Sequence, residues 1–434
     1  MRLPLRSSTV SLDRDEELME RAIALAQAVR RHTAPRPAVG CVVVAGGEIV
    51  GEGATGPFPH GAHAEAVALR AAGERAKGAA VYTTLEPCDH HGNTPPCTDA
   101  LIAAEVSRVV VAVDDPDPKV AGRGYRHLVG AGIPVDVGIG HARAERALAP
   151  YLVHRRTGRP FVVAKVAQSV DGRLAAADGS SRWITSQAAR ADAHELRADS
   201  QAIVIGASTA LADRPALTVR DLDDPPDRPP LRVVLDARGR VPASGPLFDT
   251  ALAPTLVLTT SAAPAGAVDG WRAAGAKVEV LASAGSGVDL DAALALLGSE
   301  GVLQALVEGG ARLLGAVVGE GRAHRLVAYI APTLLGTDAL PSFAFAGPRT
   351  LDAARRFELV GVSRVGDDVR LELEASVREP GMPEPGIPAS SEPWPERPVA
   401  DRDDREATRG EPSVESTGNE GDESGKVETD WSRL

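Results

Sequence analysis

The segment that says most about the architecture of this chain is Leu85-Glu-Pro-Cys88-Asp-His-His-Gly-Asn-Thr-Pro-Pro-Cys97, preceded by His63-Ala-Glu65. Zinc takes imidazole nitrogen and thiolate sulfur, which His63, Cys88 and Cys97 supply. Three protein ligands leave the fourth position of the ion for a water, which the metal acidifies. Glu65 stands where a carboxylate can take a proton from that water. The sequence therefore predicts a catalytic zinc site with Glu65 as its acid–base group.

The spacing of these residues is typical of one class of zinc enzyme. A His-x-Glu followed by Pro-Cys and a second cysteine is the signature of zinc-dependent deaminases, whose cysteines stand three residues apart. In this chain Cys97 stands nine residues after Cys88. We expect His63 and Cys88 each to begin a helix, with Pro87 fixing the approach to the second. A helix N-terminus favours the thiolate that binds metal.

Each residue of the set also has a simpler interpretation. Cys88 and Cys97 could be ordinary buried cysteines, which is how we interpret Cys41 in its apolar strand. His90 and His91 could be further ligands or polar loop residues. The combination of all the residues, in the expected order, favours the metal site.

Composition limits the kind of protein this can be. At 434 residues the chain is expected to form two or three domains. Three cysteines cannot supply a disulfide framework, and the first residues lack the apolar stretch of a signal peptide. No later apolar run is long enough for a membrane span. We therefore expect a cytoplasmic enzyme that binds no membrane.

The charge of the chain is unevenly distributed. Residues 379–434 carry −9 of the net charge of −12, so the rest of the chain is nearly neutral. We expect no nucleic-acid partner, because a phosphate backbone needs a basic surface. The segment 379–434 is rich in Glu, Pro, Ser, Gly and Asp and has no periodicity, which predicts a disordered acidic tail. Trp394 and Trp431 within it are expected to be solvated.

Strands alternate with helices through the rest of the chain, which predicts an α/β fold. We expect two domains, over residues 11–153 and 160–376, the first ending near Pro150. The strands expected in the first are 41–44, 49–50, 80–84 and 108–113, and the helices are 11–32, 63–72 and 98–104. The strands expected in the second are 161–165, 202–205, 231–235, 255–258, 303–307, 325–330 and 369–373, and the helices are 186–198, 290–297 and 311–318.

The motif residues resemble one family in particular, the bifunctional deaminase/reductases of riboflavin biosynthesis. The likeness includes Leu85 to Cys97, Ala100-Leu-Ile102, Asp115-Pro-Asp-Pro118 and Val120-Ala-Gly-Arg-Gly124. It continues in the second half with Lys165 and the segments 169–173, 179–186, 211–213, 215–220 and 308–310. It extends over residues 15–375 and leaves only the tail unexplained.

This resemblance implies a cytidine-deaminase-like three-layer α/β/α sandwich followed by a dihydrofolate-reductase-like domain. The first domain uses Zn²⁺ to hydrolyse an amino group from 2,5-diamino-6-(5-phosphoribosylamino)pyrimidin-4(3H)-one. The second uses NADPH to reduce the ribosyl side chain to a ribityl chain. The implied partner is therefore a small pyrimidine ribosyl phosphate, and a homo-oligomeric state is left open.

The resemblance also assigns residues to the two sites. Zinc is assigned to His63, Cys88 and Cys97, and the acid–base role to Glu65. The residues expected at NADPH are Ala167, Trp183, Thr209, Asp213 and Ala237, with the helix start Gly310, Ala311, Arg312, Leu313, Leu314, Gly315 and Ala316, where backbone N–H groups attract phosphate. The residues expected at the ribosyl phosphate are Ser181, Arg197, Leu217, Arg220 and Glu308, the arginines suiting its phosphate.

Some of these assignments compete with simpler interpretations. From the residues alone, Trp183 could be a core residue, Arg197 part of an ion pair on a helix surface, and Gly309-Gly310 a tight turn. Lys165 is a further candidate for assisting the open form of the ribose.

Four positions differ from the usual pattern of the family. Arg36 stands where an asparagine is expected near the deaminase substrate, and Asn93 where a basic residue is usual. Arg214 replaces the second Asp of an Ala-Asp-Asp-Pro motif, and Ala311-Arg312 replace a Pro-Thr or Pro-Ser pair. Arg36 could supply a phosphate contact that Asn93 lacks. Arg312 could pair with cofactor phosphate or reduce reductase activity.

Two other functions stay open from the sequence alone. One is a zinc deaminase of another base or nucleoside with a degenerate, inactive reductase-like domain, which would bind no NADPH. The other is a scaffold that holds a partner with its acidic tail. The complete set of His63, Glu65, Cys88 and Cys97 argues against a scaffold, because a scaffold needs no open zinc position.

Overall fold

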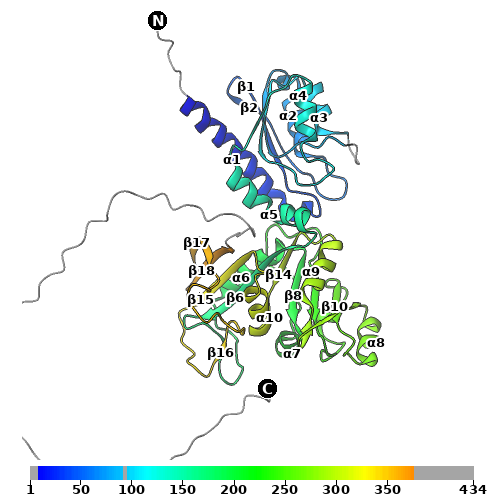
Figure 1. Ribbon diagram of the computed structural model, residues 1–434, viewed down its shortest axis with the longest axis vertical. Helices are drawn as coiled ribbons and strands as arrows, with labels where there is room; N and C mark the ends of the chain where they lie inside the picture. Colours follow the sequence, from blue (N-terminus) through cyan, green and yellow to red (C-terminus); the bar gives the residue numbers. More distant parts are fainter. Residues whose placement is uncertain (1–7, 91–94, 376–434) are drawn as a thin grey trace, which may run out of the picture. The chain divides into compact units, whose positions relative to one another are not determined.

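The computed structural model describes residues 8–90 and 95–375, with the backbone alone for residues 8–12. Two large sheets organise these residues, one in each half of the chain (Figure 1). The predictions that concern His91, Asn93 and the tail 379–434 lie outside the described residues. Among the described helices, none has both the length and the apolar character that crossing a membrane requires.

The first domain is a sheet covered by helices on both faces. Within the described residues the sheet has five strands in the order β2-β1-β3-β4-β5, of which β1 and β2 form an antiparallel hairpin and β3 to β5 run parallel. The strands are β1 (Gly40–Ala45), β2 (Glu48–Ala54), β3 (Ala80–Leu85), β4 (Arg108–Val113) and β5 (Val135–Val137). The helices are α1 (Ser8–Thr33), α2 (Ala64–Ala72), the short η1 (Gly73–Ala76), α3 (Cys97–Ala103), α4 (Arg123–Gly130) and α5 (His141–Thr157).

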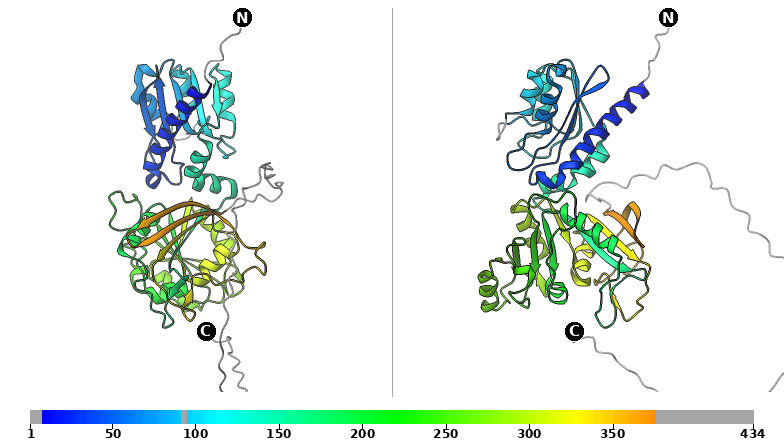
Figure 2. Two further views of the ribbon diagram at one scale, coloured as in Figure 1. Left: turned by 90° about the vertical axis from the view of Figure 1, so that its left-hand side faces the viewer. Right: turned by 180° about the vertical axis from the view of Figure 1, so that it is seen from behind.

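Helices α1 and α5 lie against one face of this sheet, and α2, α3 and α4 against the other (Figure 2). The predicted three-layer sandwich is thereby confirmed. Two boundaries differ from the prediction. Helix α1 begins at Ser8, and α5 continues through Pro150 to Thr157, beyond the predicted end of the domain at residue 153.

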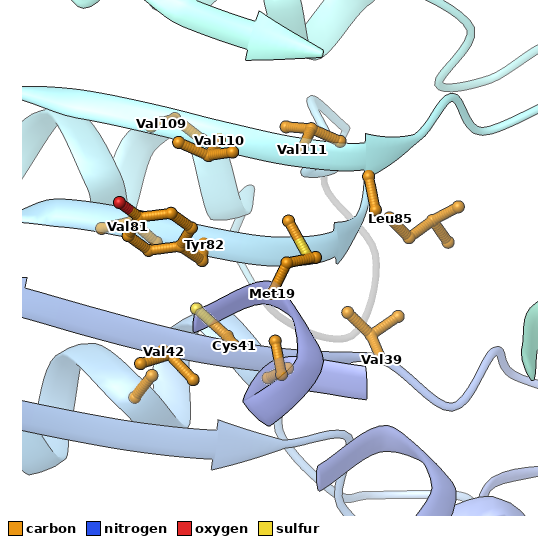
Figure 3. Close-up of a cluster of buried hydrophobic side chains, with 14 of the residues drawn as sticks. Met19, Val39, Cys41, Val42, Val81, Tyr82, Leu85, Val109, Val110 and Val111 are labelled. Atoms are coloured by element: carbon orange, nitrogen blue, oxygen red, sulfur yellow. The ribbon is translucent and has the colours of Figure 1, made fainter. Parts of the chain in front are cut away.

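Small aliphatic side chains fill the core of the first domain. Strands β1 and β4 each contain three consecutive buried valines, as expected for strands covered on both faces (Figure 3). Met19 from α1 packs against them and is fully buried. A Cβ atom at Gly40 would lie 1.9 Å from the carbonyl oxygen of Ala22, so only glycine lets α1 approach β1 this closely.

The second domain is a larger mixed sheet. Within the described residues it has nine strands in the order β11-β10-β9-β8-β14-β6-β15-β18-β17. The strands from β11 to β15 in this order run parallel, whereas β18 and β17 are antiparallel to their neighbours. This architecture agrees with the dihydrofolate-reductase-like domain that the resemblance implied.

The elements of the second domain include several that the sequence did not predict. The strands are β6 (Phe161–Ser169), β7 (Arg173–Ala175), β8 (Ala202–Gly206), β9 (Leu231–Leu235), β10 (Thr255–Thr259), β11 (Lys277–Val280), β12 (Ser283–Ala284), β13 (Gly287–Val288), β14 (Gln304–Val307), β15 (Arg325–Ala331), β16 (Leu340–Pro341), β17 (Phe357–Val365) and β18 (Asp368–Ala375). The helices are α6 (Gln187–Ala198), α7 (Ala207–Asp213), η2 (Pro246–Phe248), α8 (Ala265–Ala273), α9 (Leu290–Ser299) and α10 (Ala311–Gly319).

The parallel strands determine where a site can form in this domain. The carboxyl ends of parallel strands meet at one edge of a sheet, where α/β proteins bind their ligands. Strands β9, β8, β14 and β6 are consecutive neighbours, so the segments that follow them gather at one edge.

Candidate active sites

The three predicted zinc ligands come together in the first domain. Nδ1 of His63 lies 3.2 Å from Sγ of Cys97 and 3.5 Å from Sγ of Cys88, and the three ligand atoms lie within 4.8 Å of one another. A tetrahedral zinc ion with its usual bond lengths would hold such atoms roughly 3.5 to 3.8 Å apart. The donor types and their spacing therefore fit one zinc ion.

The prediction that Cys88 begins a helix is wrong. His63 is the N-cap of α2 as expected, but the second helix, α3, begins only at Cys97. Cys88 lies in the irregular segment after β3, and its carbonyl accepts a hydrogen bond from the N–H of Thr98, 3.3 Å away. Because of the long interval between the cysteines, α3 begins at the second cysteine instead of the first. The hydrogen bond from Thr98 holds Cys88 beside the start of α3. His90 is not a member of the ligand cluster.

The two thiols differ in acidity when no metal is bound. Hydrogen bonds with the Cys97 side chain, then with His63, lower the pKa of Cys88 to about 4 although burial opposes this. The contact with Cys88, together with burial and the nearby charge of Glu65, raises the pKa of Cys97. A divalent cation would hold both sulfurs as thiolates, so metal binding releases a proton from Cys97.

Glu65 lies beside the ligand atoms, on the first turn of α2, and is only 4% exposed. Its Oε2 accepts a hydrogen bond from Sγ of Cys97 and its Oε1 accepts one from Oγ1 of Thr83, each at 3.3 Å. Burial raises the pKa of Glu65, and the charge of Cys88 raises it further. A carboxyl group whose pKa is raised toward neutrality is suited to accept and return a proton.

Arg36, which replaces the usual asparagine, is bound to the segment that leads into His63. Its Nη1 donates to the carbonyl of Gly61 at 2.7 Å, and its Nη2 donates to those of Gly56 at 2.8 Å and Pro57 at 3.0 Å. The Arg36 side chain therefore braces residues 56–61. The phosphate contact suggested for Arg36 stays a prediction.

A second brace holds Cys88, and the sequence did not predict it. The carboxylate of Glu86 accepts the backbone N–H groups of Gly122 at 3.0 Å and Gly124 at 3.1 Å. A Cβ atom at Gly124 would lie 2.2 Å from the carbonyl oxygen of Pro87. The segment before α4 thus packs directly against Pro87 and Cys88. This contact explains why both segments belong to the motif that resembles the riboflavin-biosynthesis family.

The cofactor residues predicted for the second domain lie on the segments that follow neighbouring parallel strands. They are Ala167 near the end of β6, Thr209 and Asp213 on α7 after β8, Ala237 after β9, and the start of α10 after β14. A Cβ atom at Gly310, the N-cap of α10, would lie 3.4 Å from Oγ1 of Thr209. The starts of α7 and α10 are therefore in contact, as one binding site requires.

The structure narrows the part of α10 that can hold an anion. The N–H of Leu314 donates to the carbonyl of Gly310 at 3.1 Å, so hydrogen bonding within the helix begins there. The side chain of Leu314 is fully buried, and Gly315 packs against the Ala344 carbonyl. The N–H groups that precede Leu314, from Ala311 to Leu313, are those that a phosphate group could reach.

Trp183 is not a core residue. It lies in the segment between β7 and α6, which also contains Ser181, and it is 68% exposed. The guanidinium of Arg190 lies 4.3 Å from the centre of its ring and that of Arg182 lies 5.9 Å away. An exposed aromatic ring held in place by cations is suited to contact a ligand.

Arg197 and Glu308 form a partly buried ion pair with side-chain exposures of 16% and 11%, so the interpretation of Arg197 as part of an ion pair on a helix surface is wrong. Nε and Nη2 of Arg197 donate to the two carboxylate oxygens of Glu308 at 2.6 and 2.8 Å. Burial alone would raise the pKa of Glu308, but Arg197 and then Lys165 lower it to about 2. Burial lowers the pKa of Lys165. Three ionisable groups thus form one partly buried cluster near the end of β14.

The other two predicted substrate residues lie on the segment after α7. Leu217 is 3% exposed and has a φ angle of 48°, and Arg220 is exposed. The sequence reasoning also did not single out Thr83 and His194, which hold predicted site residues in place.

Comparison with known proteins agrees with this two-domain arrangement. The family model for the cytidine and deoxycytidylate deaminase zinc-binding region matches residues 12–113, and the model for the RibD C-terminal domain matches residues 160–371. The riboflavin biosynthesis protein RibD of Escherichia coli is 43% identical over 373 residues, which are 83% of this chain and 99% of that protein. The RibD protein of Aquifex aeolicus is 38% identical over 359 residues, or 82% and 97% of the two chains.

Two solved structures are similar over the same part of the chain. RibD of Acinetobacter baumannii superimposes with a TM-score of 0.75 at 38% identity, covering 84% of this chain and all of that one. A diaminohydroxyphosphoribosylaminopyrimidine deaminase/5-amino-6-(5-phosphoribosylamino)uracil reductase of Thermotoga maritima has a TM-score of 0.73 at 30% identity, with coverage of 84% and 100%.

The fold and the two sites define a zinc-dependent deaminase joined to an NADPH-dependent reductase in one chain. The chain belongs to the RibD family of riboflavin biosynthesis proteins. It is therefore an enzyme of riboflavin biosynthesis with deaminase and reductase activities, which act on a small molecule.

Proposed function

We propose that the two sites act in succession on one pyrimidine ribosyl phosphate. The first site hydrolyses the 2-amino group of 2,5-diamino-6-(5-phosphoribosylamino)pyrimidin-4(3H)-one. The second reduces the ribosyl side chain of the product to a ribityl chain. The observation that carries the proposal is the meeting of His63, Cys88 and Cys97 beside the buried Glu65. The reducing conditions of a cytoplasm suit these free thiols.

In the first site, His63, Cys88 and Cys97 would hold zinc, which when bound supplies an acidified water. Glu65 carries the protons. Its carboxylate takes one proton from the water that adds to the ring carbon, and delivers it to the amino group that leaves as ammonia. The second proton of the water ends on the neighbouring ring nitrogen as the new carbonyl forms. One C–O bond forms and one C–N bond breaks, so the reaction needs no redox partner. Thr83 bonds one oxygen of Glu65 whether or not zinc is bound, which fixes the direction in which the carboxyl group points.

In the second site, NADPH when bound supplies a hydride. The start of α10 and the residues of α7 would hold its phosphates and ribose, while Trp183 would cover part of it. Glu308 stays ionised because Arg197 pairs with it, and its carboxylate would accept a hydrogen bond from a hydroxyl group of the ribosyl chain. Lys165 lies in the same cluster of charged groups, where it would assist the open form of the sugar that receives the hydride.

The proposal is tested with the purified chain and the diaminopyrimidinone ribosyl phosphate. Ammonia release is measured without NADPH, and NADPH absorbance is followed after NADPH is added. We expect ammonia in the first stage and an equal amount of oxidised NADPH in the second. Ammonia without NADPH oxidation would mean a deaminase with a degenerate second domain, and the absence of both signals would refute both activities on this substrate.

A further inference from the structure

The segment from Arg214 to Asp221 has an unusual backbone. Arg214, Leu217 and Asp221 have φ angles of 44°, 48° and 57°, in the left-handed region that residues other than glycine rarely adopt. Such conformations persist only where the surrounding structure imposes them, and they gather at ligand sites. The contacts that hold the backbone in these conformations show which residue of the segment is positioned.

Three side chains from outside the segment hold its backbone. Nη1 of Arg197 donates to the carbonyl of Thr218 at 3.1 Å, and Nη1 of Arg232 donates to that of Ala216 at 3.3 Å. The backbone N–H of Arg220 donates to a side chain of α6, Nδ1 of His194, at 3.2 Å. The last of these contacts is the one that fixes Arg220 itself.

The two arginines predicted at the substrate phosphate have different roles in the structure. Arg197 is partly buried, and its guanidinium donates two hydrogen bonds to Glu308 and one to Thr218. Arg220 is exposed, and its guanidinium forms no ion pair or hydrogen bond with any residue that the structure describes. Of these two arginines, Arg220 has the exposed guanidinium that can meet an anionic ligand, and Arg197 braces the segment that carries it.

The neutral imidazole of His194 is suited to hold the backbone of Arg220. Its Nδ1 is a hydrogen-bond acceptor, so the ring proton of the neutral form is on Nε2. Burial lowers the pKa of His194, and the charges of Arg197 and Arg220 lower it further, while Glu308 and Asp221 act in the opposite direction. An imidazole that remains neutral keeps its acceptor for the N–H of Arg220.

We propose that His194 is a positioning residue of the reductase site. His194 accepts a hydrogen bond from the N–H of Arg220 and so fixes the end of the segment from Arg214 to Asp221. The Arg220 guanidinium is thereby placed to meet the terminal phosphate of the ribosyl substrate. This inference rests on the proposed reductase function and adds a residue that the sequence motifs did not contain.

The test uses two substitutions that place an amide oxygen at different ring positions. His194→Asn puts its oxygen near the position of Nδ1, and His194→Gln puts its amide near that of Nε2. We expect His194→Gln to raise the KM for 5-amino-6-(5-phosphoribosylamino)uracil about tenfold with little change in kcat, since only uniform binding is lost. His194→Asn should keep a KM close to the wild-type value. An unchanged kcat for NADPH oxidation shows that the second domain of each variant is folded, and ammonia release checks the first domain.

Calorimetric titration with ribose 5-phosphate gives a readout that does not depend on turnover. The Kd should rise about tenfold in His194→Gln and stay unchanged in His194→Asn, and binding of unphosphorylated ribose should not distinguish the variants. Rescue by Gln but not by Asn would mean that Nε2 touches the phosphate directly, which overturns the positioning role. Equal Kd values in all three proteins would overturn it too. A wild type that binds ribose 5-phosphate normally but oxidises no NADPH would refute only the proposed reduction.

Discussion

Oγ1 of Thr83 donates a hydrogen bond to Oε1 of Glu65 across 3.3 Å, and neither side chain has appreciable contact with solvent. The same hydroxyl also lies 3.3 Å from the carbonyl oxygen of Leu85, so its single hydrogen is shared between two acceptors. The bond joins strand β3 to the first turn of α2 and controls the orientation of the carboxyl group that carries protons.

Replacing Thr83 by valine should slow deamination modestly. Valine keeps the shape of the side chain but removes its donor, and a shared neutral-to-charged hydrogen bond is worth about 1 kcal/mol, or roughly a fivefold change in rate. We expect kcat for ammonia release to fall by about that factor with KM unchanged. Thr83→Ser should restore the rate, and a serine variant as slow as the valine one would contradict the orienting role.

Glu65→Gln should abolish most ammonia release while the metal stays bound. Glutamine has the same shape but cannot carry a proton, and general acid–base groups contribute roughly 10²- to 10⁴-fold to a rate. Ammonia assays and metal analysis of the purified variant measure the two properties separately. NADPH oxidation with the deaminated substrate is the internal control. Loss of zinc from this variant would show that Glu65 supports the metal site instead.

Zinc removal should separate the two activities. Treatment with a chelator is expected to stop ammonia release, because His63, Cys88 and Cys97 would lose their ion. Reduction of the deaminated substrate should continue, since the reductase residues belong to a different sheet. Restoration of ammonia release by added Zn²⁺ completes the test. A chelator that also stops NADPH oxidation would contradict the assignment of zinc to the first site alone.

Gly315→Ala should destabilise the second domain. A Cβ atom there would lie 2.3 Å from the carbonyl oxygen of Ala344, so α10 or the segment before Gly347 must move, at a cost of about 1–3 kcal/mol. Gly270→Ala in α8 is the matched control, because its Cβ atom would meet its nearest neighbour at 3.6 Å, an ordinary contact. That change should stabilise by about 0.5–1 kcal/mol. Denaturant unfolding of both variants measures the two changes in unfolding free energy, which should have opposite signs.

The stability of the second domain should decrease as the pH is lowered, because His324 becomes protonated. Burial lowers the pKa of this histidine from 6.5 to about 4, and its Nδ1 accepts the N–H of Val162 at 3.0 Å. The folded state therefore binds fewer protons than the unfolded state between these values. The contribution is fully present above pH 6.5 and is lost as pH falls toward 4, up to about 3 kcal/mol. His324→Asn keeps an acceptor without the titration, so its unfolding free energy should decline less over the same interval.

Strands with continuous apolar runs could be predicted from the sequence, because burial on both faces leaves that mark. Strand β17 (Phe357–Val365) could not be, since it is the edge of the sheet and most of its residues are exposed. Its structure comes from pairing with β18, a contact that no local pattern reveals. Helix α8 escaped prediction for a related reason, because Trp271 is its single fully buried residue.

The zinc site was predictable because its chemistry requires particular residue types in a fixed order. The helix at 98–104 was also predicted, and α3 begins one residue earlier, at Cys97. The position of Cys88 outside any helix was not predicted, since no local pattern shows it. The roles of Thr83 and His194 could not be predicted from the sequence for another reason. Thr83 reaches Glu65 through the position of β3 relative to α2, and His194 meets Arg220 through the path of a segment with an unusual backbone. Such contacts depend on tertiary structure and carry no local signal.

The separation of the two sites onto different sheets has a genetic consequence. A gene copy encoding Glu65→Gln and a second copy encoding Glu308→Gln would each lack one step, but they would lack different steps. Cells that carry both copies should grow without added riboflavin if the intermediate passes between molecules, whereas neither copy alone would support growth. Fusion of the two enzymes fixes their ratio at one to one and does not oblige a single polypeptide to complete both reactions.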